Sequence, residues 1–180
     1  GLVDKAVMTK VQRDALLSTM TDDVAVMVLR NNYYQAQALS IDEANSQFHF
    51  DSFTRLTQYL VNSADLNRQL EYLPDDEELQ TRSNAQQGLT RSELAVLMAY
   101  SKMDVHNALL QEKQLITDKY FEKYLLSAFP SVLAKTHYQA VINHPLAKQI
   151  IATSIANEIF NRGGIHAVRE QTGASIAEIV

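Results

Sequence analysis

Cysteine is absent from the 180-residue sequence, and glycine and proline are scarce, with five and three residues respectively. Without cysteine the chain can form neither disulfides nor cysteine-ligated metal sites, and it has no cysteine nucleophile. Folds rich in hairpin turns or phosphate-binding loops use glycine at those turns. The shortage of glycine therefore disfavours all-β and α/β folds.

Long apolar runs and an excess of positive charge are also lacking. No apolar run approaches the ~20 residues that a membrane span requires, and the first residues show no signal-peptide pattern. The formal net charge is −5, whereas nucleic acids and anionic membranes both favour a basic surface. We therefore expect no nucleic-acid partner and no membrane partner. A cytoplasmic location agrees with the missing cysteines.

The composition is that of an ordinary globular protein, with 46% hydrophobic and 21% charged residues. Apolar residues recur at the 3.6-residue spacing of an α-helix throughout the chain. A chain of this length can bury one core. These features predict an all-α fold, a single multi-helix domain of about eight or nine helices over residues 1–180. The central helices are predicted at 22–38, 91–112 and 145–162.

The helix predicted at 22–38 is the one around which the others are expected to pack. Thr21 can cap its start, and residues 24–29 are six consecutive apolar residues. Such a run indicates a helix that is covered on every side. Polar residues follow on one stripe, at i, i+3, i+4 and i+7, and should hydrogen-bond to neighbouring helices. They are Arg30, Tyr33, Tyr34 and Gln37.

Four capping-box patterns, beginning at Thr9, Ser40, Thr90 and Ser175, mark further helix starts. The remaining helices are predicted at 10–20, 41–62, 66–72, 76–86, 118–127, 131–142 and 165–172. The first residue is not methionine, and the helix that Ser175 would open is not completed before the sequence ends. We therefore expect a piece excised from a longer chain. The alternative is a natural domain with a frayed end.

Motifs that carry chemistry are not found. The sequence has no glycine-rich phosphate loop, no paired histidines of a zinc protease and no nucleophile elbow. Its five histidines are scattered over different predicted helices and turns. We therefore predict no catalytic residue, no cofactor-binding residue and no metal ligand. The acidic run at 75–78 is expected to be a helix N-terminus, where the helix dipole favours negative charge.

Two polar clusters remain as candidate docking or effector faces. The first consists of the stripe residues Arg30, Tyr33, Tyr34 and Gln37, and the second, on the helix at 145–162, of Asn157, Asn161 and Arg162. Arginine suits a carboxylate or phosphate ligand. The alternative interpretation is internal hydrogen bonding that fixes how the helices pack. The sequence leaves both interpretations open.

Four stretches together resemble the C-terminal helical region of the very large bacterial NAD-specific glutamate dehydrogenases. They are MTDDVA through YYQAQALS at 20–40, LEYLPDDEEL at 70–79, GLTRSELAVLMAY at 88–100 and HPLAKQIIATSIANEIFNR at 144–162. Their order and spacing agree with that family over nearly the whole chain. Ser92 stands where the family usually has proline, and Asn31 where aspartate is common.

The resemblance implies a parent chain that converts L-glutamate, NAD and water to 2-oxoglutarate, ammonia and NADH. Its dinucleotide-binding domain, with a catalytic lysine and aspartate, lies N-terminal to this region, and none of those motifs occurs here. The resemblance thus implies a non-catalytic structural or regulatory domain without its own cofactor. Its partners would be the catalytic domain of its own chain and other subunits of a homo-oligomer. The alternative is a free-standing helical protein-interaction module.

Overall fold

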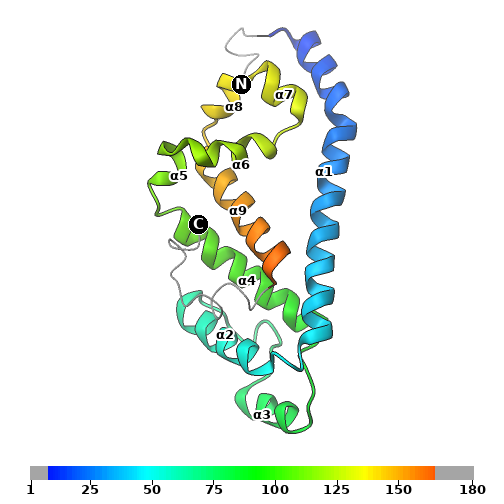
Figure 1. Ribbon diagram of the computed structural model, residues 1–180, viewed down its shortest axis with the longest axis vertical. Coiled ribbons are helices and arrows are strands. Elements are labelled where there is room, and N and C mark those ends of the chain that lie inside the picture. Colours follow the sequence, from blue (N-terminus) through cyan, green and yellow to red (C-terminus); the bar gives the residue numbers. More distant parts are fainter. Residues whose placement is uncertain (1–7, 165–180) are drawn as a thin grey trace.

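A computed structural model describes residues 8–164 of the chain. These residues form helices joined by turns and contain no β-strand, so the predicted all-α class is confirmed (Figure 1). The helices are α1 (Lys10–Asn45), α2 (Phe50–Ser63), α3 (Asp76–Asn84), α4 (Arg91–Leu109), α5 (Gln114–Thr117), the 3-10 helix η1 (Lys119–Phe121), α6 (Glu122–Ser127), α7 (Ser131–Thr136), α8 (Tyr138–Ile142) and α9 (Ala147–Gly163).

Helix α1 is one continuous element of 36 residues, where the sequence predicted two helices and the start of a third. It contains neither glycine nor proline. The hydroxyls of Thr21 and Ser40, the predicted caps, instead donate to the carbonyl oxygens four residues earlier, at 3.3 and 2.9 Å. Serine and threonine make such bonds inside helices, so the two predicted breaks are wrong. The capping box at Thr9 is confirmed.

Two hydrophobic cores hold the described helices together. The first lies between the C-terminal end of α1, helix α2, helix α3 with its flanking loops, and the first half of α4, and its most deeply buried members include Phe53, Leu60, Leu94 and Leu97. The second lies between the last part of α4 and helices α5 to α9, and includes Leu109, Leu125, Ile151 and Phe160. Helix α4 contributes to both cores, and α9 packs against α4. The central positions predicted for the helices at 91–112 and 145–162 are thus confirmed.

The central position predicted for the helix at 22–38 is wrong. Helix α1 runs along one edge of the molecule, from the end near α7 and α8 down to the level of α2, on the right in Figure 1. Its buried residues, Ala38 and Asp42, both lie near its C-terminal end. Residues 24–29, expected to be covered on every side, are exposed apart from the half-buried Met27. An apolar run indicates that a helix is packed against other protein surface, but it does not show which part of the protein supplies that surface.

Shorter elements also differ from the prediction. Residues 66–72 form turns, with positive φ at Tyr72, in place of a helix. The helix predicted at 118–127 is divided into η1 and α6 and is capped by Asp118, which accepts from the amide of Tyr120 at 2.8 Å. The helix predicted at 131–142 breaks at His137. The predicted helix at 165–172 and the cap at Ser175 lie outside the described residues.

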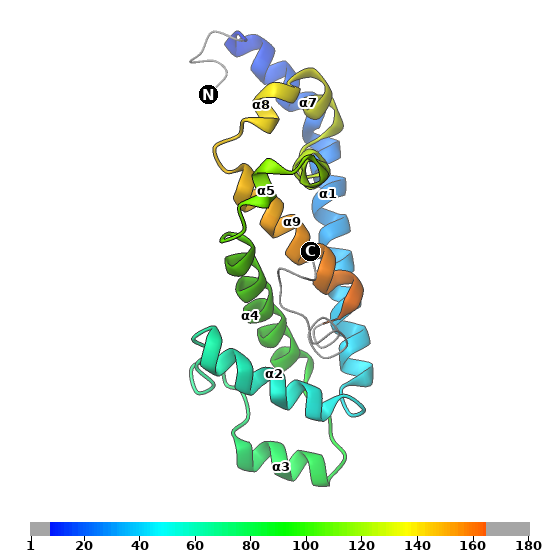
Figure 2. The same ribbon diagram turned by 60° about the vertical axis from the view of Figure 1, so that its left-hand side comes forward.

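The two ends of the elongated molecule are formed by different helices (Figure 2). Helices α2 and α3 close one end, beside the C-terminal end of α1, while α7 and α8 lie near the other. Within residues 8–164, no helix has both the length and the apolar character of a membrane-crossing segment.

Candidate functional site

The amides of Asn157 and Asn161 meet a lysine where α9 packs against α4. These asparagines lie one helical turn apart, and their Oδ1 atoms accept from Lys102 Nζ at 3.0 and 3.1 Å. Burial lowers the pKa of Lys102, because desolvation disfavours its charged form. The pair of amide acceptors is what the internal hydrogen-bonding interpretation of this cluster predicts.

Arg162, the third predicted member of this cluster, does not join it. Its side chain is 80% exposed and forms an ion pair of 3.1 Å with Glu158, one turn earlier on α9. Ion pairs of this exposed i,i+4 kind contribute about 0.3–0.5 kcal/mol. Lys102, which the sequence analysis missed, replaces Arg162 as the cation of the cluster. A lysine on another helix leaves no spacing signal that would connect it with Asn157 and Asn161.

The other predicted cluster lies on the exposed side of α1. The side chains of Arg30, Tyr33, Tyr34 and Gln37 are all exposed, and none makes a hydrogen bond or ion pair with another residue of the described chain. The two tyrosine rings contact each other edge to face, with centroids 5.9 Å apart. The expected hydrogen bonds to neighbouring helices are therefore wrong for residues 8–164.

Apolar side chains share the exposed side of α1 with this polar stripe. Val26, Leu29 and Tyr33 are 61%, 67% and 63% exposed, and their spacing of i, i+3 and i+7 places them on one face. We call Val26, Leu29, Arg30, Tyr33 and Gln37 the outer face of α1. Large apolar residues at such exposure on one helix face indicate a surface that contacts something else.

The C-terminal end of α1, in contrast, is held firmly. Arg91, the first residue of α4, donates to Ser40 Oγ at 2.9 Å, to Glu43 Oε2 at 3.1 Å and to the carbonyl of Ala36 at 3.1 Å. Gly88 lies so close to the turn after α1 that a Cβ there would come within 2.9 Å of the Gln47 amide nitrogen. The last turns of α1 are thereby fixed to α4 and its preceding loop.

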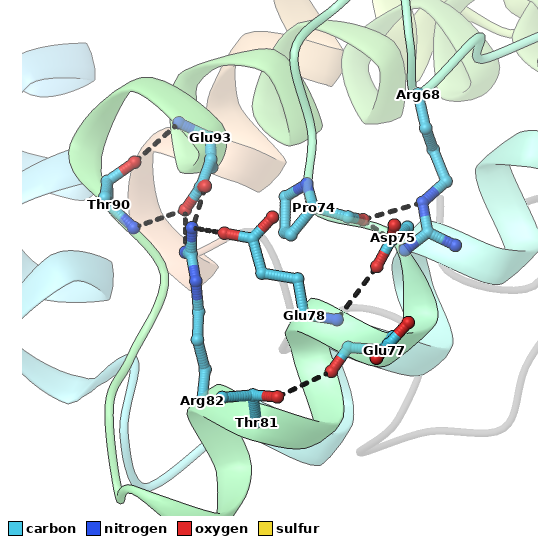
Figure 3. A network of polar contacts seen from close by, with 9 residues as sticks. All are labelled: Arg68, Pro74, Asp75, Glu77, Glu78, Thr81, Arg82, Thr90 and Glu93. Atoms are coloured by element: carbon cyan, nitrogen blue, oxygen red, sulfur yellow. Dashed lines mark hydrogen bonds and ion pairs between the residues drawn. The ribbon is translucent and has the colours of Figure 1, made fainter.

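A polar network joins α3 to the start of α4 (Figure 3). Glu93 is buried and accepts both from the amide of Thr90, at 2.7 Å, and from Arg82 Nη1, at 3.0 and 2.9 Å. The bond to Glu93, more than the second bond to Glu78, raises the pKa of Arg82. Glu93 thus completes the capping box predicted at Thr90 and anchors α3 as well.

The acidic run at 75–78 belongs to the same network. Asp75 caps α3 by accepting from the amide of Glu78 at 2.8 Å, and Asp76 pairs with Arg68 at 2.6 Å. Glu78 pairs with Arg82. These contacts confirm the structural interpretation of the run as a helix N-terminus.

The described residues offer no other chemical centre. In residues 8–164 no group of three histidine, aspartate or glutamate side chains is placed to hold a metal ion. An open cleft of about 240 Å³ lies beside α2 and α3, where Phe50 and Leu79 meet polar side chains. Residues 8–164 thus form a helical region held together by two hydrophobic cores and by its own polar contacts, with one helix face left uncovered.

Comparison with known proteins identifies the class to which such a region belongs. Residues 86–180 match the family model "Glutamate dehydrogenase, C-terminal", and residues 1–42 match "Bacterial NAD-glutamate dehydrogenase, catalytic domain". The first match covers more than half of the chain, which therefore belongs to the glutamate dehydrogenase C-terminal family. The resemblance seen in the sequence is confirmed.

Individual relatives agree with this assignment. NAD-specific glutamate dehydrogenase from Pseudomonas aeruginosa is 44% identical over 176 residues, which cover 96% of this chain and 11% of that protein. The enzymes of the same name from Halomonas elongata and Mycobacterium tuberculosis are 35% and 32% identical over 99% and 92% of this chain. The chain thus spans about a tenth of the length of the relatives that it matches.

The two family matches divide the structure in an informative way. The catalytic-domain match ends at residue 42, inside α1, and so includes the whole outer face of that helix. The C-terminal match includes all of α4 to α9. The sequence resemblance had placed the catalytic domain entirely before this region, whereas the match extends that domain into α1.

Proposed function

We propose that this chain is the helical C-terminal region of a bacterial, cytoplasmic NAD-specific glutamate dehydrogenase. The complete enzyme converts L-glutamate, NAD⁺ and water to 2-oxoglutarate, ammonium, NADH and a proton. The observation that carries this proposal is the order of the two family matches on one chain, catalytic domain first and C-terminal family second. The names of the relatives, each an NAD-specific glutamate dehydrogenase, support the reaction.

The role of this region is structural or regulatory, and NAD and the reacting groups belong to other parts of the enzyme. Polar side chains at two helix contacts support this role, because they pair with one another. Lys102 binds α4 to α9, and Glu93 binds α3 to α4. A side chain engaged in holding two helices together is poorly placed to act on a substrate. The partners are the catalytic domain of the same protein and, in a homo-oligomer, its other subunits.

Glutamate-dependent formation of NADH tests whether the reaction is carried out by other parts of the enzyme and not by this region. The full-length enzyme and the 180-residue chain are purified separately and assayed by NADH absorbance with glutamate and NAD. We expect NADH from the full-length enzyme and none from the 180-residue chain. NADH production by the 180-residue chain would overturn the non-catalytic role, and an inactive full-length enzyme that is folded would overturn the proposed reaction.

The size of the native protein tests the proposed parent chain. An antiserum raised against the 180-residue chain is used to probe an extract of the source cells by immunoblot. The proposal predicts a band far above 20.3 kDa, the mass of this chain. A band at that mass would instead show a free-standing protein, such as the helical interaction module considered above.

A further inference from the structure

Most of α1 contributes nothing to the two hydrophobic cores. No residue from 10 to 37 is buried, although this stretch includes Val24, Val26, Val28 and Leu29. These side chains point in several directions around the helix, since consecutive residues are about 100° apart. A helix that is apolar on several sides is normally enclosed by protein. Helices α4 and α9, which contact α1, cover only one side of it.

We propose that the outer face of α1 is the docking surface for the catalytic domain that precedes this region in the complete dehydrogenase. This inference rests on the proposed function. Helix α1 is then shared between two parts of the enzyme. Its outer face packs into the catalytic domain, and its last two turns are clamped to α4 by Arg91.

The boundary between the family matches identifies the occupant. All five outer-face residues, from Val26 to Gln37, fall within residues 1–42, which match the catalytic-domain model. The relatives are about nine times as long as this chain, which spans only 11% of the Pseudomonas enzyme. A catalytic domain whose matched sequence ends in a helix with an uncovered apolar face would bury apolar surface by packing against that face.

The charge on the outer face indicates what the catalytic domain presents to it. Arg30 lies beside Val26 and Tyr33 and has no carboxylate partner among residues 8–164. An arginine covered by an apolar interface needs an acceptor, because an unpaired buried charge is strongly unfavourable. The opposing surface is therefore apolar opposite Val26 and Leu29 and carries a carboxylate within reach of Arg30.

Thiol labelling in the full-length enzyme tests this inference. The described chain has no cysteine, so single substitutions here introduce defined sites, and peptide mass spectrometry separates them from any thiols elsewhere. Leu29→Cys tests the outer face. Ile116→Cys is the matched control, because Ile116 is apolar and 62% exposed but lies on α5, away from α1 (Figure 1). Each labelling rate is compared with the rate of the same variant in denaturant.

We expect the native enzyme to label Leu29→Cys at least tenfold more slowly than the denatured enzyme, with Ile116→Cys much less protected. A native rate for Leu29→Cys within about threefold of the denatured rate would show a free surface and overturn the inference. Protection that disappears on dilution would show a second copy as the occupant and would also overturn it. The NADH assay on the same samples reports independently on the proposed function, since labelling does not depend on turnover.

Discussion

Two arginines show how differently the same residue type is used in this chain. Arg82 is partly buried and makes charge-assisted bonds to Glu93 and Glu78, whereas Arg30 projects from α1 without a hydrogen-bond or ion-pair partner in the described residues. Charged groups that are buried depend on their partners, since removing one partner leaves the other desolvated and unpaired. The Arg82 pair therefore contributes to the stability of this region, whereas we propose that Arg30 contacts the rest of the enzyme.

Loss of Glu93 is expected to be costly. Glu93→Ala removes two bonds to Arg82 and one side of the capping box that starts α4. We expect the free energy of unfolding of the 180-residue chain to fall by about 2–3 kcal/mol, because charge-assisted bonds and part of a helix cap are lost while Arg82 keeps its pair with Glu78. The matched control is Glu78→Ala, which breaks a more exposed pair with the same arginine and should cost no more than about 1 kcal/mol. Equal losses in urea unfolding would show that burial does not distinguish the two pairs.

Substitution of Arg30 tests whether its side chain contributes to the stability of the 180-residue chain by itself. In the 180-residue chain Arg30→Ala should change the free energy of unfolding by less than about 0.5 kcal/mol, because the side chain is exposed and unpaired. Arg91→Ala, which removes three bonds to α1, should cost about 1–2 kcal/mol and serves as the control. A loss of 1–3 kcal/mol on Arg30→Ala would indicate a buried stripe within this chain, as the sequence first suggested.

At the scale of helices, the contact between α4 and α9 combines a cation with neutral acceptors. Lys102 donates to Asn157 and Asn161, and partial burial holds its pKa below the ordinary 10.5. The unfolded chain therefore binds a proton at this lysine more readily than the folded chain. The contribution of Lys102 to the free energy of unfolding is therefore most favourable above pH 10.5. It is lost as the pH falls from there through the lower pKa of the folded state.

Lys102→Met removes this titration and so tests it. As the pH is lowered from about 11 to about 8, the wild-type chain should lose stability relative to Lys102→Met. Urea unfolding of both proteins at the two pH values measures the difference, and contributions from other titrating groups cancel. A difference that stays constant between the two pH values would contradict a lowered pKa at Lys102.

The sequence predicted the helices whose start signals are local. Helix α3 begins after its cap Asp75, and α4 begins after Thr90 with its partner Glu93, as their spacing indicated. The continuity of α1 could not be predicted in this way, because a serine or threonine hydroxyl can serve as a cap or bond to a carbonyl inside a helix. The Ser40 hydroxyl bonds to a carbonyl inside the helix, and its oxygen also accepts from Arg91, 51 residues away in the sequence.

The candidate clusters were predicted less completely than the helices. Asn157 and Asn161 were recognised, together with Arg162, as a polar cluster on one helix, but their donor Lys102 comes from another helix. The stripe at Arg30 was recognised as polar and in need of partners, and the described chain provides none. Helical spacing shows which residues share a face, while the identity of what lies opposite depends on tertiary structure.

At the scale of the whole molecule, α1 and α4 have different structural roles. Helix α4 passes through both hydrophobic cores and unites the described region, while α1 lies along its edge with its outer face uncovered (Figures 1 and 2). The family matches follow the same division, with α1 assigned largely to the catalytic domain and α4 to the C-terminal family. Our proposal that α1 docks on the catalytic domain would explain why its sequence resembles that of a buried helix.

The most direct test of this arrangement is the glutamate-dependent NADH rate of full-length enzyme carrying Leu29→Glu, compared with Ile116→Glu. Both substitutions place a carboxylate at an apolar position that is exposed in the described chain, at 67% and 62% respectively. A charge forced into an apolar interface costs several kcal/mol. We predict that Leu29→Glu lowers the rate at least tenfold and that Ile116→Glu leaves it within about twofold of wild type. An unchanged rate for Leu29→Glu would contradict the docking of α1 on the catalytic domain.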